Sequence, residues 1–239
     1  MALPKIDLPL FETKLPSNDK VINYRPFTVK EEKVLLIAQE SAEPEQMILA
    51  MKQIAGNCCD GLSTDGMAMF DLEYLMLQIR SKSVDNNIKF TINDPDTGNP
   101  VELELNVEDI KLHTPDNHSQ KIDINDDMYL MMRYPTLDEV GLFLKLDFEP
   151  NQGADAAELL FDVMVSCIDC LVNGDEVQKM SDFTKKEVRD FIETFPGGTI
   201  DNLKNFFETI PTLRYDATYT NSEGEEKTVV LEGTETFFL

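Results

Sequence analysis

Alternating hydrophobic and polar residues predict several β-strands along the chain. The clearest pattern runs from Ile88 to Leu105, where apolar residues alternate on both sides of the turn-forming stretch Asp94–Asn99. Other stretches alternate in the same way and are expected to form a first hairpin, two short strands and a last hairpin. They lie at residues 5–25, 121–125, 128–133 and 213–231.

Apolar residues spaced three and four positions apart predict helices between these strands. The stretch from Ala154 to Val172 is the longest and most apolar of them. Asn173-Gly174 predicts its end, because Gly tolerates the left-handed conformation of a helix cap. The expected helices lie at about 29–39, 44–56, 67–81, 137–146, 154–172, 184–195 and 199–210.

One short sequence occurs twice, each time between a predicted strand and a predicted helix. It reads Arg25-Pro26-Phe27-Thr28-Val29-Lys30-Glu31 near the start and Arg133-Tyr134-Pro135-Thr136-Leu137-Asp138-Glu139 past the middle. In each copy a Thr is followed three residues later by a Glu, which is the pattern of a capping box. The proline keeps the entry to the helix extended. We call each copy a strand-to-helix joint.

The two joints suggest an internal repeat. An offset of 108 residues aligns Thr28 with Thr136, and one further residue aligns Cys58 with Cys167. Duplication is the favoured interpretation, and chance similarity between two hairpin-and-helix units is the alternative. The predicted fold class is α+β with two similar halves, each built as hairpin, helices and hairpin. The halves are expected at 1–112 and 120–239, with a linker at 113–119.

Charge narrows the possible functions. The chain has 45 acidic and 21 basic residues among 239, a formal net charge of −24. The simplest explanation of this charge is a solvated surface. The more specific explanation is a binding face for a basic partner or mimicry of nucleic acid. Binding of nucleic acid is disfavoured because it needs a cationic patch. The apolar runs are too short to span a membrane, and no signal peptide is recognisable, so a cytoplasmic protein is expected.

Cys167 and Cys170 have the spacing of a redox or zinc motif. On the predicted helix 154–172 both thiols would lie on one face, near the end of the helix. Redox pairs of this kind lie at the start of a helix, where the dipole lowers the thiol pKa. Cys58 and Cys59 could in principle join them in a zinc site. Buried apolar cysteines are the favoured interpretation, and a Cys-based or zinc enzyme is the alternative.

The other candidate residues form no recognisable site. His113 and His118 are expected to be exposed histidines of the linker, and no Ser or Cys nucleophile pairs with them. Asp94-x-Asp96-x-Gly98 has a few features of a calcium loop but lacks its later Gly and Glu, so a hairpin turn is expected. The sequence therefore predicts no catalytic, cofactor-binding or metal-binding residues.

The chain ends in three apolar residues, Phe237, Phe238 and Leu239. They either pack on the protein's own core or insert into a partner, and they are our candidate partner contacts. If they are contacts, deleting them should impair partner binding with little loss of folding. An unfolded truncation would show that the tail belongs to the core.

Several of these segments together resemble the base-plate protein family of T-even-type tailed phages. The resemblance rests on the residues around the first joint, the residues around the second joint and two other stretches, and it spans nearly the whole chain. These residues are Tyr24 to Lys33, Leu77 to Val84, Met132 to Leu137, Gly233 and Phe237-Phe238.

The resemblance implies a non-enzymatic role as a base-plate hub subunit or hub-assembly factor of a contractile tail. It implies no catalytic residues and no cofactor. The implied partners are other hub or tail proteins, met in the host cytoplasm during assembly or within the base plate of the virion. The alternative from the charge alone is an acidic inhibitor or nucleic-acid mimic that binds basic host proteins.

Overall fold

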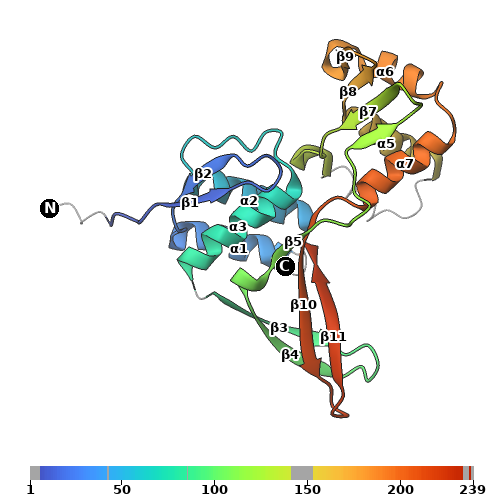
Figure 1. Cartoon of the computed structure of the whole chain (residues 1–239). Coiled ribbons are helices and arrows are strands. Elements are labelled where there is room, and N and C mark those ends of the chain that lie inside the picture. Colours follow the sequence, from blue (N-terminus) through green and yellow to red (C-terminus); the bar gives the residue numbers. More distant parts are fainter. Residues whose placement is uncertain (1–5, 42, 85, 141–152, 234–236, 238–239) are drawn as a thin grey trace. The chain divides into compact units, whose positions relative to one another are not determined.

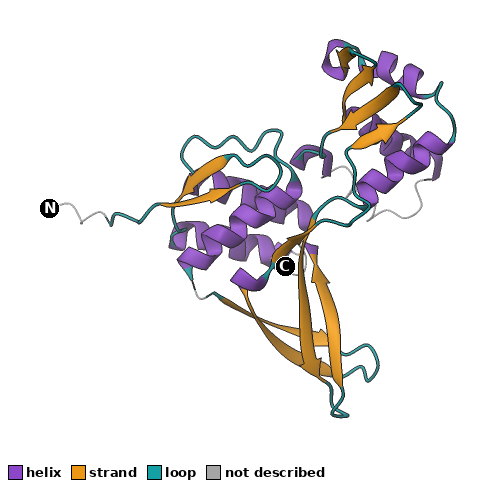
Figure 2. Cartoon of the chain, viewed as in Figure 1, coloured by secondary structure: helices purple, strands orange, loops and turns teal. Residues whose placement is uncertain are grey.

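The computed structural model describes residues 6–41, 43–84, 86–140, 153–233 and 237. Helices and strands in small antiparallel sheets make the protein α+β, as the sequence predicts (Figure 1, Figure 2). The chain divides into two compact units. Unit 1 comprises Met1–His113 and Thr212–Leu239, and unit 2 comprises Thr114–Pro211.

This division differs from the halves expected at 1–112 and 120–239. Residues 212–239 group with the N-terminal part of the chain, and residues 114–119 group with unit 2. The reason is strand pairing: β5 (Lys111–His113) lies beside β10 (Thr212–Thr220), with His113 opposite Thr212. The last hairpin therefore completes unit 1, and unit 2 is an insertion between two paired strands.

The helical part of unit 1 consists of α1 (Val29–Ser41), α2 (Pro44–Cys58) and α3 (Met69–Ser83). Pro44 opens α2 at a position where its missing N–H costs nothing. Most side chains of α3 are buried, so this helix is the centre of the unit. Its largest fully buried side chains are Leu72, Leu75, Met76, Leu77 and Ile79.

The first hairpin, β1 (Phe11–Lys14) and β2 (Val21–Tyr24), packs onto these helices (Figure 1). A buried carboxylate holds its turn in place. Asp71, in the first turn of α3, accepts hydrogen bonds from the backbone N–H of Ser17 at 3.0 Å and from its hydroxyl at 2.5 Å. The hairpin is thus attached to α3 by its turn as well as by its apolar face.

Two further hairpins complete unit 1. They are β3 (Asn87–Asn93) with β4 (Pro100–Asn106), and β10 with β11 (Glu226–Glu232). A 3-10 turn, Val107–Asp109, leads from β4 to β5. The strand order β11-β10-β5 leaves β11 at the edge of its sheet.

A buried hydrogen bond joins the two hairpins. The hydroxyl of Tyr219 on β10 donates to Oδ2 of Asp94 at 2.8 Å, and Asp94 is 1% exposed. The other oxygen of Asp94 accepts from the N–H groups of Asp96 and Thr97 within its own turn. Hydrogen bonds to a buried carboxylate are stronger than those between neutral groups. One carboxylate therefore shapes the β3–β4 turn and ties it to β10.

Unit 2 is a four-stranded antiparallel sheet with three helices described around it. Its strand order is β6-β7-β8-β9, and its core consists of side chains from the sheet and the helices. The strands are β6 (Lys121–Asp123), β7 (Met128–Met132), β8 (Ile168–Asn173) and β9 (Glu176–Lys179). The helices are α5 (Gly153–Ser166), α6 (Lys185–Ile192) and α7 (Gly198–Glu208), with a 3-10 turn at Met180–Asp182.

The expected helix over 154–172 is wrong in its second half. The helix α5 ends at Ser166, and the chain continues as β8, which pairs with β7 on one side and β9 on the other. Asn173-Gly174 belongs to the turn of the β8–β9 hairpin and caps no helix. Ile168, Leu171 and Val172 are apolar residues that suit a buried strand, and pairing on both sides outweighs their local helical spacing.

The expected helix at 137–146 begins at Leu137, and residues 141–152 lie outside the described part.

The insertion of unit 2 yields a prediction. Because His113 and Thr212 are opposite each other in an antiparallel pair, their Cα atoms lie about 5 Å apart. Replacing residues 114–211 with a short Gly-Ser linker should leave unit 1 folded, and residues 114–211 alone should fold as well. Urea unfolding followed by circular dichroism should show one cooperative transition for each part. A part that shows no cooperative transition would contradict this division.

Candidate functional site

The first strand-to-helix joint is organised by one ion pair. The guanidinium of Arg25 donates to the carboxylate of Glu31 at 3.2 Å and to two carbonyls, of Pro26 at 2.8 Å and of Asn57 at 3.0 Å. The other oxygen of Glu31 accepts from the N–H and the hydroxyl of Thr28. Glu31 is 3% exposed. The strand, the start of α1 and the end of α2 therefore meet at this pair.

The second joint repeats these contacts in unit 2. Arg133 donates to both oxygens of Glu139, at 2.9 and 2.7 Å, and to the carbonyls of Tyr134 and Ser166. Glu139 also accepts from the N–H and the hydroxyl of Thr136 and from the hydroxyl of Ser166. This bidentate pair is the more complete of the two.

The backbone around the joints repeats as well. The N–H of Arg25 donates to the carbonyl of Cys58, and that of Arg133 donates to the carbonyl of Cys167, both within 2.9 Å. The preceding residues then pair in the same way, Tyr24 with Cys59 and Met132 with Ile168. These partners follow the sequence offset of 108 residues with one residue added after the joint. The same contacts are thus made at the positions that the sequence aligns.

The electrostatics of the joints favour charged carboxylates. Burial by itself would raise the pKa of Glu31, but hydrogen bonds from Thr28 and Arg25 outweigh it and lower this pKa to about 2. The same balance lowers the pKa of Glu139 to about 2. Because every oxygen of both carboxylates accepts a hydrogen bond, neither is available as a general base. The joints position helices, and their chemistry is structural.

The cysteines are buried thiols. Burial raises the pKa of Cys58 to about 11 and the pKa of Cys59 and Cys167 to about 12, so at neutral pH they are not thiolates. Cys170 lies in β8, so the expectation that Cys167 and Cys170 share one face of a helix is wrong. Among the described residues, no group of three or more His, Cys, Asp or Glu side chains is placed to hold a metal ion.

His118 is not the exposed linker residue that the sequence predicts. Its ring packs against those of Tyr134 and Phe206, which also contact each other, and its nitrogens lie 3.0 Å from the hydroxyl of Thr209 and 3.1 Å from that of Tyr134. Thr209 already donates to the carbonyl of Asn205, so it accepts from Nδ1. Burial lowers the pKa of His118, which keeps the ring neutral in this cluster. His113 is exposed at the end of β5.

The turn at Asp94 is a hairpin turn, as expected. Its carboxylate is occupied by hydrogen bonds from Asp96, Thr97 and Tyr219. These hydrogen bonds lower the pKa of Asp94, those from Thr97 and Tyr219 first. The carboxylate serves the fold of unit 1.

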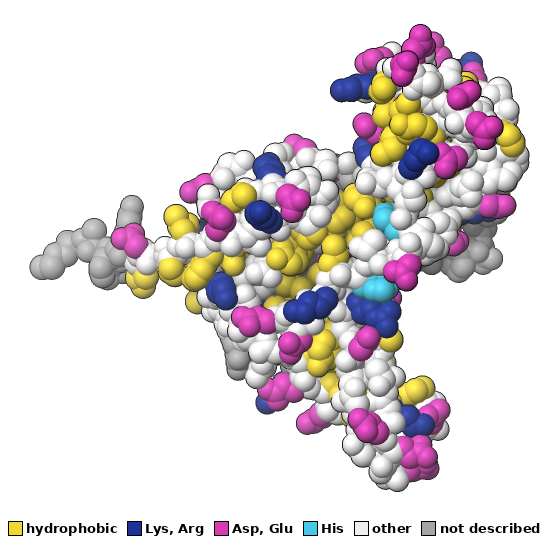
Figure 3. Space-filling model, in the orientation of Figure 1, with side chains coloured by type: hydrophobic (Ala, Val, Ile, Leu, Met, Phe, Trp, Pro, Cys, Tyr) yellow, Lys and Arg dark blue, Asp and Glu magenta, His cyan; other side chains and the backbone are white. Residues whose placement is uncertain are grey.

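A hollow in unit 2 is our candidate surface for binding another protein; its wall is polar at Arg133 and Glu139 and apolar at Phe183 and Phe191. Two adjoining pockets, of about 360 and 310 Å³, share Met180, Phe183 and Val188 in their walls. Phe183 is 44% exposed and Phe191, which lines the smaller pocket, is 36% exposed. Figure 3 shows hydrophobic side chains gathered on the visible face of unit 2. Large exposed aromatic side chains beside a hollow are typical of protein interfaces.

No pattern in the sequence locates this hollow, although a local signal for part of its wall is present. Thr184 and Glu187 form the predicted capping box of α6. Phe183 is the residue before the cap, and Val188 is the fourth helical residue, which are the two positions of a hydrophobic staple. The staple predicts a contact between Phe183 and Val188. Phe183 lines the smaller pocket together with Leu171 of β8 and Gln178 of β9. The sequence predicts a helix in place of β8 and no strand at β9, so it does not predict this surrounding.

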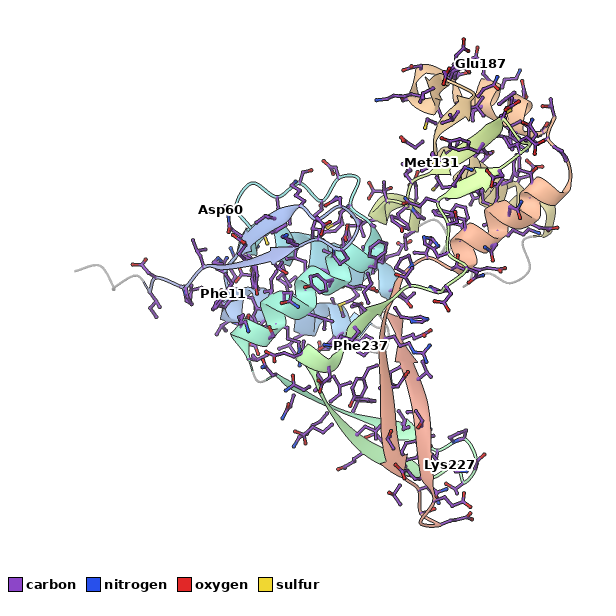
Figure 4. All side chains as sticks on the ribbon, viewed as in Figure 1. Phe11, Asp60, Met131, Glu187, Lys227 and Phe237 are labelled. Atoms are coloured by element: carbon purple, nitrogen blue, oxygen red, sulfur yellow. The ribbon has the colours of Figure 1, made fainter. Side chains whose placement is uncertain are left out.

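Of the three candidate partner contacts at the C-terminus, the structure describes Phe237. Phe237 is 4% exposed and lies at the base of the β10–β11 hairpin, next to the helices of unit 1 (Figure 4). This side chain therefore packs on its own unit. Phe238 and Leu239 lie outside the described residues.

Comparison with known proteins places the chain in one family. The model of the T4 bacteriophage base plate protein family matches residues 8–239. The comparisons with curated proteins and with solved structures gave no match. Within the described residues, no helix is both long and apolar enough to cross a membrane.

The joint carboxylates should make unit 2 sensitive to acid. Because the pKa of Glu139 falls from an ordinary 4.5 to about 2 on folding, its contribution is complete above pH 4.5 and is lost as the pH falls towards 2. Glu139→Gln should cost about 2 kcal/mol at pH 7, since it removes hydrogen bonds to a charged group. It should also flatten the dependence of stability on pH below 4.5. Urea unfolding of the variant and the parent between pH 2.5 and 7 measures both effects.

Glu187→Gln is the matched control for this prediction. Glu187 has the same capping contacts with Thr184, but among the described residues it has no arginine partner and it is exposed. Its removal should change stability far less. Equal effects of the two substitutions would show that capping alone, without Arg133, accounts for the joint.

Phe237→Ala should destabilise unit 1. Truncating a buried Phe in a well-packed site costs about 3–5 kcal/mol. Leu49→Ala, at a side chain that is 56% exposed on α2, should change the free energy of unfolding by less than about 0.5 kcal/mol. Urea unfolding of both variants measures the difference. A stability of Phe237→Ala close to that of the parent would mean that Phe237 is not part of the core.

Proposed function

The chain belongs to the T4 bacteriophage base plate protein family, and from this premise we propose that it is a non-enzymatic hub subunit or hub-assembly factor. It acts through protein–protein contacts with other hub or tail proteins while a contractile tail is assembled. The family match carries this proposal, because it extends from residue 8 to residue 239 and so includes both units.

The chemistry of the described side chains supports a role in binding. The groups that most often act as nucleophiles or bases are engaged within the fold. The thiols are buried with raised pKa values, the joint carboxylates are saturated with hydrogen bonds, and His118 is held in an aromatic cluster. A protein of this kind acts through its surface.

The hollow of unit 2, on its apolar side, is the surface that we propose for these contacts. Phe183 and Phe191 present aromatic side chains beside adjoining pockets, and Val177 on β9 is 63% exposed. Burying such side chains against a partner removes apolar area from water, and aromatic anchors commonly dominate the energy of an interface. We also keep Phe238 and Leu239 as candidate contacts, because Phe237 anchors the tail to unit 1.

The proposed locations follow the proposed role. The protein meets its partners in the host cytoplasm during assembly, and a hub subunit stays in the base plate of the virion. The second candidate function is that of an acidic inhibitor or nucleic-acid mimic, which the net charge of −24 favours. Binding of that kind weakens steeply with salt because exposed charges are screened, whereas apolar contacts are not.

Co-purification with base-plate proteins tests the proposal. The tagged full chain should be co-expressed with the hub and tape-measure proteins of the same phage and washed at 0.1 and 1 M salt. We expect a hub or tail protein to remain bound at both concentrations. The double variant Phe183→Ser/Phe191→Ser should lose at least ten-fold in retained partner while circular dichroism stays unchanged. Ile200→Ala, at another exposed apolar residue of unit 2, is the control and should retain the partner.

Two results would contradict the proposal. Binding only to basic host proteins, lost in 1 M salt, would favour the acidic mimic. Retention of a tail protein by the double variant would preserve the assembly role but remove the hollow as its surface. Incorporation into purified tails, measured by mass spectrometry, separates a hub subunit from a transient assembly factor.

A further inference from the structure

The strand β11 presents an open backbone edge in unit 1. It is seven residues long, pairs with β10 on one side, and is the outermost strand in the order β11-β10-β5. An edge strand carries a row of backbone donors and acceptors that can pair with another extended chain. Strand addition of this kind is a common mode of peptide recognition.

The phase of the ladder shows which groups face outward. The N–H of Asn221 donates to the carbonyl of Glu225, and the N–H of Glu225 donates to Oδ1 of Asn221, so the backbone groups of this pair point towards each other across the hairpin. Antiparallel pairs alternate between bonded and non-bonded, so Lys227, Val229 and Leu231 point their backbone groups towards β10. The N–H and C=O groups of Thr228 and Val230 therefore point to the open edge. Both side chains are exposed, Val230 by 46%.

The surroundings of this edge are acidic. The two hairpins, residues 87–106 and 212–232, contain nine acidic and three basic residues. Each basic side chain is already neutralised within the unit. Lys89 pairs with Glu104, Arg214 with Asp216 and Glu232, and Lys227 with Asp96 and Glu225. Among the described residues, Glu102, Glu223 and Glu226 are left without a cation, and Glu226 begins β11.

Internal contacts fix the edge before a partner arrives. The Tyr219–Asp94 hydrogen bond, the Lys227–Asp96 ion pair at 3.0 Å and the hydrogen bond from Asn99 to Ser222 at 3.0 Å tie the hairpins together near their turns. Figure 4 shows Lys227 near the tip of the β10–β11 hairpin. A preorganised surface loses little conformational entropy on binding.

We propose that the β11 edge binds an extended, basic strand of a partner protein. The strand pairs with the backbone of Thr228 and Val230, places a β-branched or apolar side chain beside Val230, and places Lys or Arg beside Glu226. Charge complementarity selects this occupant, because opposite charges across strands stabilise a pair and like charges destabilise it. A second copy of this acidic chain is disfavoured for the same reason.

This inference deepens the proposed function, because it names a surface and a class of partner for it. Its test needs no phage protein other than this chain. The probe is a capped seven-residue peptide, Thr-Val-Lys-Thr-Val-Lys-Thr, added to the 15N-labelled full chain at low salt. In antiparallel pairing its second Lys lies beside Glu226 when its first Val lies beside Val230. Hydrogen exchange read by NMR should show slower exchange at the amides of Thr228 and Val230, with Val229 unchanged because its N–H already bonds to β10.

Three comparisons make the test specific. Val230→Pro removes the outward N–H but leaves the bonds of its neighbours to β10, and Pro is tolerated at such an edge position. It should weaken peptide binding at least ten-fold, and Val230→Thr should leave binding within two-fold. Glu226→Lys should weaken binding about as much at low salt as adding 0.5 M salt does to the parent. A peptide with Glu in place of Lys should bind at least ten-fold more weakly.

Clear results would overturn the inference. Absence of protection at Thr228 and Val230 at millimolar peptide, or equal binding to parent and Val230→Pro, would exclude the edge as the site. Sedimentation that shows a dimer abolished by Val230→Pro would assign the edge to a second copy. If Val230→Pro fails to fold, the protection pattern of the parent and the Glu226→Lys comparison decide. Failure of this test leaves the co-purification test of the proposed function untouched.

Discussion

The ion pair between an arginine and a glutamate at each strand-to-helix joint is the interaction on which the rest of the fold depends. Glu139 caps the helix that begins at Leu137, binds Arg133 at the end of β7 and accepts from Ser166 at the end of α5. Removing one partner of such a pair leaves the other charge without its hydrogen bonds in a place with little access to water, which is costly. Three elements are therefore held together by a single carboxylate, and Glu31 does the same in unit 1.

The two joints make equivalent contacts, and these contacts reveal a motif that the two units share. Both units combine a hairpin, a joint and a helix whose last turn returns to the strand, with Cys58 and Cys167 at the returning position. The units then differ. In unit 1 the returning chain forms one bridge, at Cys59, and in unit 2 it continues as β8 and β9. The two units thus share the structural motif of the joint, and each adds its own strands to it.

Local signals predicted most of the fold, and non-local pairing accounts for the failures. The capping box of Thr184, the start of α2 at Pro44 and the β3–β4 hairpin were predicted because each depends on residues close in sequence. The stretch 168–172 was misassigned because its strand is defined by β7 and β9. For the same reason, no local pattern could place His118 against Tyr134 and Phe206 or expose Phe183 beside a pocket.

The distribution of satisfied and unsatisfied groups among the described residues fits the proposed role in binding. Its buried ionisable groups at the joints and at Asp94 have partners, so they contribute stability and specify geometry. Among the described residues, the surface offers apolar area at Phe183, unneutralised carboxylates such as Glu226, and the backbone of β11. Apolar area gives affinity, backbone pairing gives orientation, and charge restricts the partner. A component that joins one assembly and avoids pairing with itself needs affinity, orientation and selectivity. An acidic open edge supplies the orientation and the selectivity together.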